Sequence, residues 1–220
     1  MCIRDSRYTT QIEPHDYICE VNNTLSHINS ILIGHSQDMW SYISKNYFLQ
    51  KNVPGEIGSS TMPHKINPIN FENAEGNLGL ANSMFRFLSD KLTISRLQRD
   101  LSDSTVLRNL GVGFGYSLLA YENLIRGLSK LTINKNKILE DIEDAWELLA
   151  EPIQMVARKY NISNSYELLK EVTRGQSVTK KILHNLIMSL KIPKSEKDKL
   201  LLLTPKNYIG YAVDLCNDKR

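Results

Sequence analysis

The sequence predicts an all-α protein in which a long-helix bundle is followed by a smaller helical domain. Two observations predict this fold class. In the first part of the chain, apolar residues recur at steps of three and four residues over long, unbroken stretches, as in helices that pack into a bundle. Beyond Leu131, shorter helical patterns are separated by clear breaks. We therefore expect part of a central helical bundle over residues 7–131 and a C-terminal helical domain over residues 132–220.

The first long helix is predicted after Pro14, with Asp16 as its candidate N-cap. Residues 1–6 (MCIRDS) show no such patterning and no apolar stretch of a signal peptide follows them, so we expect a non-native leader there. The helical pattern continues for about seven turns. Its apolar positions are Ile18, Val21, Leu25, Ile28, Leu32, Met39 and Ile43.

Two further long helices are predicted, from Phe71 to about Leu88 and from Ser104 to about Leu131. The latter contains the run GVGFG at 111–115. Its glycine spacing differs from that of a phosphate-binding loop, and no strand is visible before it. We interpret these glycines as small residues that let neighbouring helices approach closely.

The second domain is predicted to contain shorter helices. They cover Ile138–Ala150 with an interruption at Pro152, Tyr166–Arg174 ended by Gly175, Thr179–Leu190, and Pro205–Cys216.

The composition excludes several classes of protein. The 27 basic and 24 acidic residues are interspersed, giving a net charge of +3, which argues against a nucleic-acid-binding surface and fits a local cluster of arginines for a small anion. The three cysteines are far apart, with neither disulfide nor metal-ligand spacing, so we expect a reducing, cytoplasmic location, no metal and no cofactor. No apolar run approaches the ~18 residues that a membrane span needs, so we predict no membrane partner.

A polar segment, GEIGSSTMPHKINP at 55–68, lies in a loop expected over residues 51–68. Its glycines permit unusual backbone angles, its hydroxyls can donate hydrogen bonds, and Lys65 and Asn67 add a cation and an amide. Such a loop is suited to gripping carboxylates and closing over them. A solvated connector has the same composition, however, and composition alone does not separate the two interpretations.

A second polar segment, SRLQRDLSDSTVLRN at 95–109, contains three arginines. Ser104 and Thr105 near a predicted helix start offer hydroxyl and N–H groups, and Arg108 lies one turn further on the same face. With Arg99 they could form a phosphate cradle. The alternative is ordinary capping by Asp103 or Ser104 with surface arginines nearby.

The histidines have structural alternatives as well. His27, His35 and His184 lie within helical patterns, where packed or surface positions are expected. His15 lies in a polar segment directly before the first helix, where a functional role and a simple turn explain it equally well.

The first polar segment carries a family resemblance. GSSTMPHKINP resembles the signature of the fumarase/aspartase superfamily, and the histidine before Lys65 resembles its adenylosuccinate lyase branch. Further segments are similar to the bacterial form of that branch: TTQIEPHD, FENAEGNLGL, SRLQRDLSDSTVLRNLGVG, LAEPIQ and TPKNYIG. The resemblance runs from about Arg7 to the end of the chain.

The resemblance implies a β-elimination that releases fumarate from adenylosuccinate, giving AMP, and from the succinyl-carboxamide ribotide of purine biosynthesis. It implies that Ser59 is the catalytic base and that the complete enzyme is a homotetramer with a nucleotide substrate. The substrate-binding residues that it implies are Gln11, Ser60, Lys65, Ile66, Asn67, Asn73, Arg99, Ser104, Thr105, Val106, Leu107 and Arg108.

Members of the branch are longer than this chain, and the resemblance places their general-acid histidine in an N-terminal half that is missing here. We therefore assign no general acid and expect the 220-residue chain alone to be inactive and to self-associate. Two alternatives remain: another fumarate-releasing lyase or cycloisomerase of the same superfamily, and a non-catalytic helical assembly module.

Overall fold

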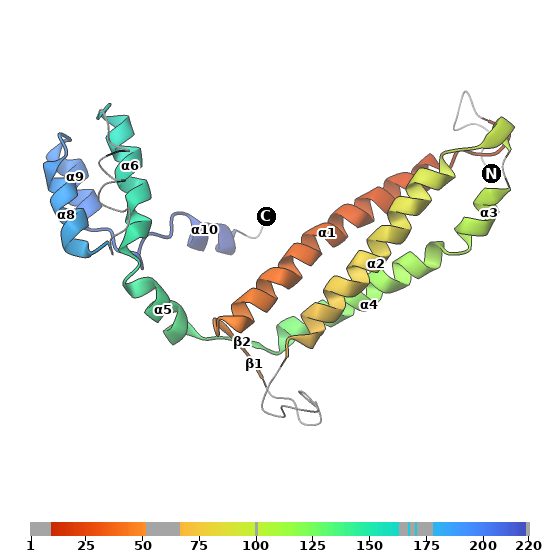
Figure 1. The fold of residues 1–220 in the computed structure, drawn as a ribbon, viewed down its shortest axis with the longest axis horizontal. Helices are drawn as coiled ribbons and strands as arrows, with labels where there is room; N and C mark the ends of the chain where they lie inside the picture. The colour runs from red at the N-terminus through yellow and green to blue at the C-terminus, as the bar shows by residue number, and fades with distance from the viewer. Residues whose placement is uncertain are drawn as a thin grey trace. The chain divides into compact units, whose positions relative to one another are not determined.

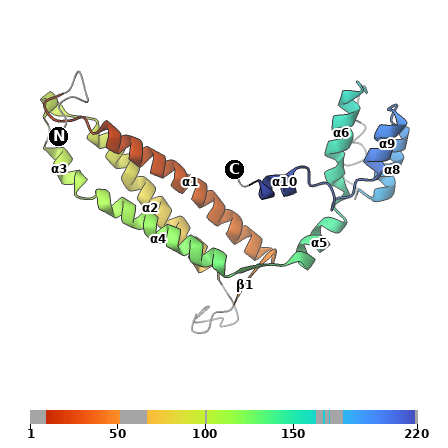
Figure 2. The same ribbon diagram turned by 180° about the vertical axis from the view of Figure 1, so that it is seen from behind.

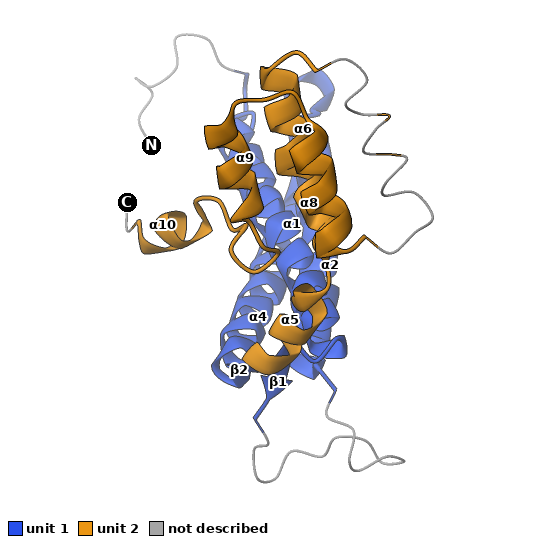
Figure 3. Ribbon diagram, turned by 90° about the vertical axis from the view of Figure 1, so that its left-hand side faces the viewer, with its two compact units in different colours: residues 1–134 blue, residues 135–220 orange. Residues whose placement is uncertain are grey.

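The computed structural model describes residues 10–51, 67–99, 101–162, 167, 170 and 178–218, and every structural statement below concerns these residues. The expected leader lies outside them. So do Ser59, Ser60, Lys65 and Ile66 of the signature loop, and Gly175 with most of the helix predicted at 166–174. The chain divides into two compact units, residues 1–134 and residues 135–220, coloured separately in Figure 3. Each unit is described by itself.

Three long helices form the first unit: α1 (Asp16–Ser44), α2 (Ile69–Leu92) and α4 (Leu110–Ser129). Figures 1 and 2 show α2 running alongside both α1 and α4. One buried cluster, around Phe71 and Leu78, lies near the start of α2, and a second, around Leu88, lies near its end. The predicted all-α class is thus confirmed, and α2 is the helix that packs against both of the others.

The third long helix is interrupted, contrary to the prediction of one helix over 104–131. A short helix α3 (Ser102–Leu107) ends in a turn at residues 108–109 before α4 begins. The chain also leaves the helix after Ser129. Leu131 belongs instead to strand β2 (Leu131–Ile133), which pairs antiparallel with β1 (Phe48–Gln50). Three-residue strands are too short to show an alternating pattern, so the sequence did not reveal them.

Helix α1 begins as predicted, but its cap is different. His15 is the N-cap residue, in the left-handed region at φ 60°, and its carbonyl accepts hydrogen bonds from the N–H groups of Ile18 and Cys19. Asp16 is therefore the first helical residue, and the prediction that it caps the helix was wrong. An acidic residue in the first turn is still favourable at the positive end of the helix dipole.

The face that α1 buries is polar. Its buried residues are small and mainly polar: Cys19, Asn22, Ser26, Asn29 and Ser36. Asn29 donates to the Ser117 hydroxyl over 3.0 Å and accepts from the Tyr121 hydroxyl over 2.6 Å, both on α4. Of the predicted apolar stripe, Leu32, Met39 and Ile43 are partly buried against the cluster around Phe71, whereas Val21 and Ile28 are 48% and 43% exposed.

The glycine run on α4 supports close helix approach at one position. A Cβ on Gly113 would lie 2.8 Å from the ring of Phe85 on α2, whereas Gly111 and Gly115 face open space. Gly113 itself is buried. The structural interpretation of the run is therefore confirmed for its central glycine.

The second unit contains short helices around an apolar core. They are α5 (Lys135–Glu143), the 3₁₀ helix η2 (Trp146–Leu149), α6 (Ala150–Lys159), α8 (Lys180–Ser189), α9 (Lys194–Leu201) and α10 (Ala212–Asn217). Pro152 lies in the first turn of α6, where no intrahelical donor is lost, and not at an interruption as predicted. Thr179 caps α8 by accepting the N–H of Ile182. The helix predicted from Pro205 begins only at Ala212.

Candidate functional site

The expected site residues that the structure describes lie at two opposite ends of the bundle. Asn67 precedes α2, and Asn73 is exposed near its start. Gln11, Arg99 and the run 104–108 lie at the other end, where α2 finishes and α1 begins (Figure 1). Helix α2 has 24 residues, which at 1.5 Å per residue is about 36 Å. One copy of the chain therefore does not bring the two groups together.

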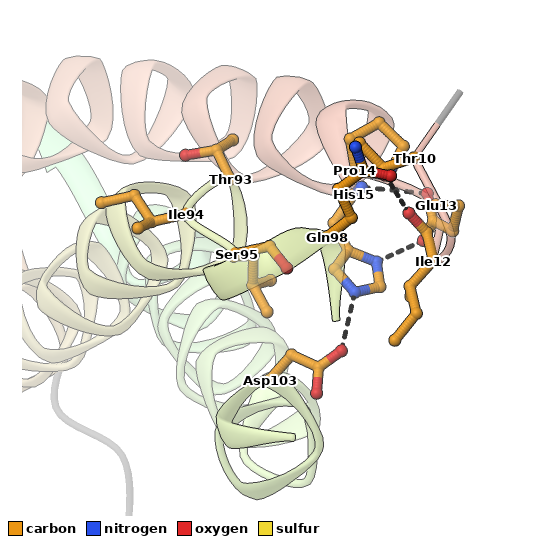
Figure 4. A pocket seen from close by; sticks show the side chains of 11 residues that line it. Thr10, Ile12, Glu13, Pro14, His15, Thr93, Ile94, Ser95, Gln98 and Asp103 are labelled. Carbon is orange, nitrogen blue, oxygen red and sulfur yellow. Dashed lines mark hydrogen bonds and ion pairs between the residues drawn. The ribbon is translucent and has the colours of Figure 1, made fainter. Parts of the chain in front are cut away.

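The end that carries Gln11 has a small cavity of about 160 Å³. Its walls come from the segment before α1, the connection between α2 and α3, and Asp103 on α3 (Figure 4). Ligand pockets for small molecules usually span about 300–1,000 Å³. This cavity is thus too small to enclose a nucleotide, and its importance lies in the side chains that join its walls.

His15 forms the main polar link across this cavity. Its ring Nε2 lies 3.3 Å from an Asp103 carboxylate oxygen, and its Nδ1 contacts the Glu13 carboxylate. The His15 backbone N–H also donates to Glu13 over 2.9 Å. Figure 4 shows the ring between the two carboxylates. His15 is only 8% exposed, so water competes little for these contacts.

Asp103 connects this link to the predicted substrate-binding run. One of its carboxylate oxygens faces His15, and the other accepts the backbone N–H of Ser104 over 2.5 Å. The N-cap of α3 is Leu101, with no side-chain cap, so the alternative of capping by Asp103 or Ser104 is not what the structure shows. Since the Ser104 N–H is occupied and α3 has six residues, an anion there would depend on side chains and not on the helix terminus.

Helix α3 separates its polar and apolar side chains. Ser104, Thr105 and Arg108 are exposed, as a substrate-binding face requires. Val106 and Leu107 are half-buried and pack against the buried cluster around Leu88.

The approach to α3 is a bent segment that places Arg99 at the surface. Leu97 and Gln98 both adopt left-handed angles, with φ 50° and 63°, and they end the 3₁₀ helix η1 (Arg96–Gln98). Such angles are uncommon for residues other than glycine. Arg99 follows in extended conformation and is exposed, and its N–H donates to the Arg96 carbonyl over 2.9 Å.

Two other ionisable groups near this end have shifted pKa values. The Glu13 carboxylate raises the pKa of the Tyr17 hydroxyl through its negative charge. Burial, followed by the charges of Asp16 and Asp90, raises the pKa of the Cys19 thiol. Its Sγ also donates to the Ser89 carbonyl over 3.4 Å. Because the thiol is held protonated, Cys19 is poorly suited to act as a nucleophile.

The remaining histidines behave as the sequence predicted. His27 is exposed, and His35 and His184 are half-buried in their helices. The His184 ring packs edge-on against Trp146, with centroids 6.5 Å apart. Within the described residues, no three His, Cys, Asp or Glu side chains gather as metal ligands, and no helix is both long and apolar enough to cross a membrane.

The sequence did not reveal the pairing of His15 with Asp103. The two residues are 88 positions apart, and neither carries a spacing signal toward the other. Each had a local explanation, one as a turn residue and the other as a helix cap. The packing of α3 beside the start of α1 and the end of α2 brings them together.

Comparison with known families gives two matches. The model of the family described as adenylosuccinate lyase C-terminal matches residues 95–209, and a model described as lyase matches residues 4–81. These matches confirm the resemblance that the signature loop predicted.

Curated relatives named adenylosuccinate lyase are similar along almost the whole chain. The protein of Vibrio cholerae serotype O1 is 55% identical over 208 residues, that of Escherichia coli K12 is 54% identical over 211, and that of Legionella pneumophila Corby is 57% identical over 208. The alignments cover 94–96% of this chain and 46% of each relative. The chain thus spans less than half of the length of these relatives.

A solved structure supports the fold. The class II fumarase of Schistosoma mansoni superposes with a TM-score of 0.64 over 87% of this chain and 39% of that one, at 17% sequence identity. At this identity the likeness concerns the fold alone, and it confirms an all-α architecture of the fumarase type.

Proposed function

The chain belongs to the adenylosuccinate lyase C-terminal family, and on that premise we propose that it is part of an enzyme that eliminates fumarate from adenylosuccinate. The observation that carries the proposal is the 54–57% identity to relatives of that name along 94–96% of the chain. The second substrate would be the succinyl-carboxamide ribotide of purine biosynthesis. Both are small nucleotides, and the proposed location is the cytoplasm.

The chemistry assigns different tasks to the two ends of the bundle. A base takes the proton from the carbon beside a carboxylate, the C–N bond breaks, and an acid protonates the departing nitrogen. The resemblance assigns the base to Ser59 and the grip on substrate carboxylates to Ser60, Lys65 and Asn67. The charge that develops on the carboxylate side needs fixed N–H donors and cations, which such a loop provides.

The opposite end would bind the nucleotide 5′-phosphate. Arg99 and Arg108 are exposed there, and guanidinium groups bind phosphate through paired hydrogen bonds. The exposed hydroxyls of Ser104 and Thr105 lie on the short helix α3, and Arg108 is its C-cap residue. The acid that completes the reaction is not assigned to any residue of this chain.

The separation of the two ends supports a site shared between copies of the chain. From Asn73 to the end of α2 the rise of the helix is about 30 Å, and a mononucleotide is far shorter. We infer that the loop end of one copy meets the phosphate end of another in a homo-oligomer, which the resemblance implies is a tetramer. Exposed apolar residues on the outer face of α4 favour such assembly. They include Val112, Leu118, Leu119, Ile125 and Leu128, each 44–68% exposed.

A chimera tests the activity. Residues 7–220 would replace the matching part of the Escherichia coli relative, and fumarate release from adenylosuccinate would be followed by absorbance. We expect turnover by the chimera, none by its Ser59→Ala variant, and none by the 220-residue chain alone. A folded, tetrameric chimera without turnover would contradict the proposal, as would substantial turnover by Ser59→Ala.

Protection by AMP separates this function from the alternatives. A ligand that binds only the folded state raises the unfolding temperature. We expect AMP to raise the unfolding temperature of the chimera at millimolar concentration, with adenosine as the control that lacks the phosphate. A lyase or cycloisomerase for a different succinyl compound, or a non-catalytic module, would show no such difference between the two.

A further inference from the structure

We propose that His15 is a positioning residue, which holds the substrate-binding face of α3 in place through Asp103. The proposal rests on the proposed function, because α3 matters only if Ser104, Thr105 and Arg108 bind the nucleotide. His15 itself need not touch the substrate. Its role would be to fix where those exposed side chains stand relative to Gln11.

The first support is the geometry of the link. The Asp103 carboxylate has one oxygen 3.3 Å from His15 Nε2 and the other 2.5 Å from the Ser104 backbone nitrogen. One carboxylate therefore joins the N-cap of α1 to the first residue of the substrate-binding run. Its side chain is 19% exposed and that of His15 is 10% exposed, so this contact is largely shielded from water.

The second support is that α3 is short and lies at the surface. The helix has six residues, none of them buried, and isolated helices shorter than about 12 residues are marginal in water. Val106 and Leu107 hold its apolar side against the end of α2. The contact of Asp103 with His15 links α3 to the segment that carries Gln11.

The third support is the conformation of His15. Its φ of 60° is uncommon for a residue other than glycine, and such angles persist where surrounding contacts determine them. Glu13 provides these contacts, since its carboxylate accepts the His15 N–H and faces the ring Nδ1. Pro14 between them restricts the chain further. The ring is thus held in the orientation that faces Asp103 (Figure 4).

The position of the link predicts which kinetic constant depends on it. His15 lies where α1 begins and α2 ends, whereas the opposite end of the bundle carries the end of α1 at Ser44 and the start of α2 at Ile69. In the sequence, the proposed base loop lies between those two residues. Disturbing α3 should weaken nucleotide binding and leave the elimination step intact. In the complete enzyme or the chimera, we expect His15→Gln to raise KM for adenylosuccinate by about tenfold and to change kcat by less than about twofold. The inhibition constant of AMP should rise in parallel with KM.

A double-mutant cycle tests whether His15 acts through Asp103. The four proteins are the unmodified enzyme, His15→Gln, Asp103→Asn and the double variant. If the two residues act as one link, the double variant should have the KM of the worse single variant, because the second change removes nothing further. His27→Gln, an exposed histidine on the same helix, is the matched control and should leave KM unchanged.

The outcomes separate this inference from the proposed function. If the unmodified enzyme does not cleave adenylosuccinate, the proposed function fails. If it does, three results would overturn the role of His15: KM and the AMP constant unchanged, single effects that add in the double variant, or a large loss of kcat at unchanged KM. A lower unfolding temperature with normal KM would show that His15 contributes only to stability.

Discussion

Gly113 on α4 lies directly beneath the ring of Phe85 on α2, so close that a Cβ at position 113 would be 2.8 Å from the ring carbon Cε1. Phe85 is completely buried, so its ring cannot move aside without disturbing the core. The contact limits how closely the two helices can approach near the start of α4.

Replacing this glycine should therefore destabilise the protein. We expect Gly113→Ala to lower the free energy of unfolding by about 1–2 kcal/mol, because overpacking outweighs the helix propensity gained by alanine. Gly111→Ala and Gly115→Ala are matched controls on the same helix, and both face open space. Denaturant unfolding should show these two unchanged or slightly stabilised. Equal effects at all three positions would contradict the packing argument.

The buried Asn29 should be costly to remove. It is completely buried, and its loss would leave the hydroxyls of Ser117 and Tyr121 without their partner. We expect Asn29→Ala to lower the free energy of unfolding by about 2–3 kcal/mol. Asn23→Ala, at an exposed position on the same helix, should cost far less. If both variants unfold at the same denaturant concentration, the polar contact is not important for stability.

Cys19 should be protected from thiol reagents. Burial raises the pKa of its thiol, so the reactive thiolate appears at higher pH than in an exposed cysteine. At pH 8 we expect iodoacetamide to label the exposed Cys216 and not Cys19, as read by peptide mass spectrometry.

The raised pKa of the Cys19 thiol also makes the stability of the protein depend on pH. Because the unfolded chain loses the Cys19 proton first, the contribution of this group is present below the ordinary thiol pKa and is lost as the pH rises through the folded value. Cys19→Ala should remove this part of the alkaline loss of stability. An unchanged pH dependence in that variant would show that the thiol does not contribute.

Arg108 should contribute to binding and not to folding. Its side chain is exposed at the C-cap of α3, so Arg108→Lys should leave the unfolding temperature within about 1 °C. Lysine keeps the charge but loses the paired hydrogen bonds to phosphate, so we expect KM to rise about tenfold in the complete enzyme. Arg158→Lys, exposed on α6 of the second unit, is the control and should leave KM unchanged.

The sequence predicted much of the fold because long helices leave a strong periodic signal. The bundle helices appeared with approximate ends, and the family resemblance of the loop was confirmed by the matching relatives. The interruption at residues 108–109 escaped notice because neither glycine nor proline marks it. Likewise, Pro152 was taken as an interruption, although the first turn of a helix accepts proline.

The site was harder to predict because tertiary contacts join its described parts, the segment before α1 and helix α3. Such contacts leave no pattern in the sequence. The spacing of His15 and Asp103 in the sequence does not indicate their contact, and it does not indicate the left-handed backbone angle at His15. The burial of polar residues on α1 was also unexpected. Periodicity identifies an apolar stripe, but it does not show which face of the helix packs against the other helices. The role of Ser59 stays a prediction, as it lies outside the described residues.

The face that α1 turns inward has a consequence for how the protein responds to dilution. Within one copy, the fully buried residues of α1 are mainly asparagine and serine, and Leu32 and Met39 are only partly buried, while Val21, Ile28 and Ile31 remain 43–62% exposed. In the proposed homo-oligomer, another copy would cover these exposed residues and add to the hydrophobic free energy of the helix. The unfolding temperature should therefore rise with protein concentration, as it does for chains whose folding and assembly are one equilibrium.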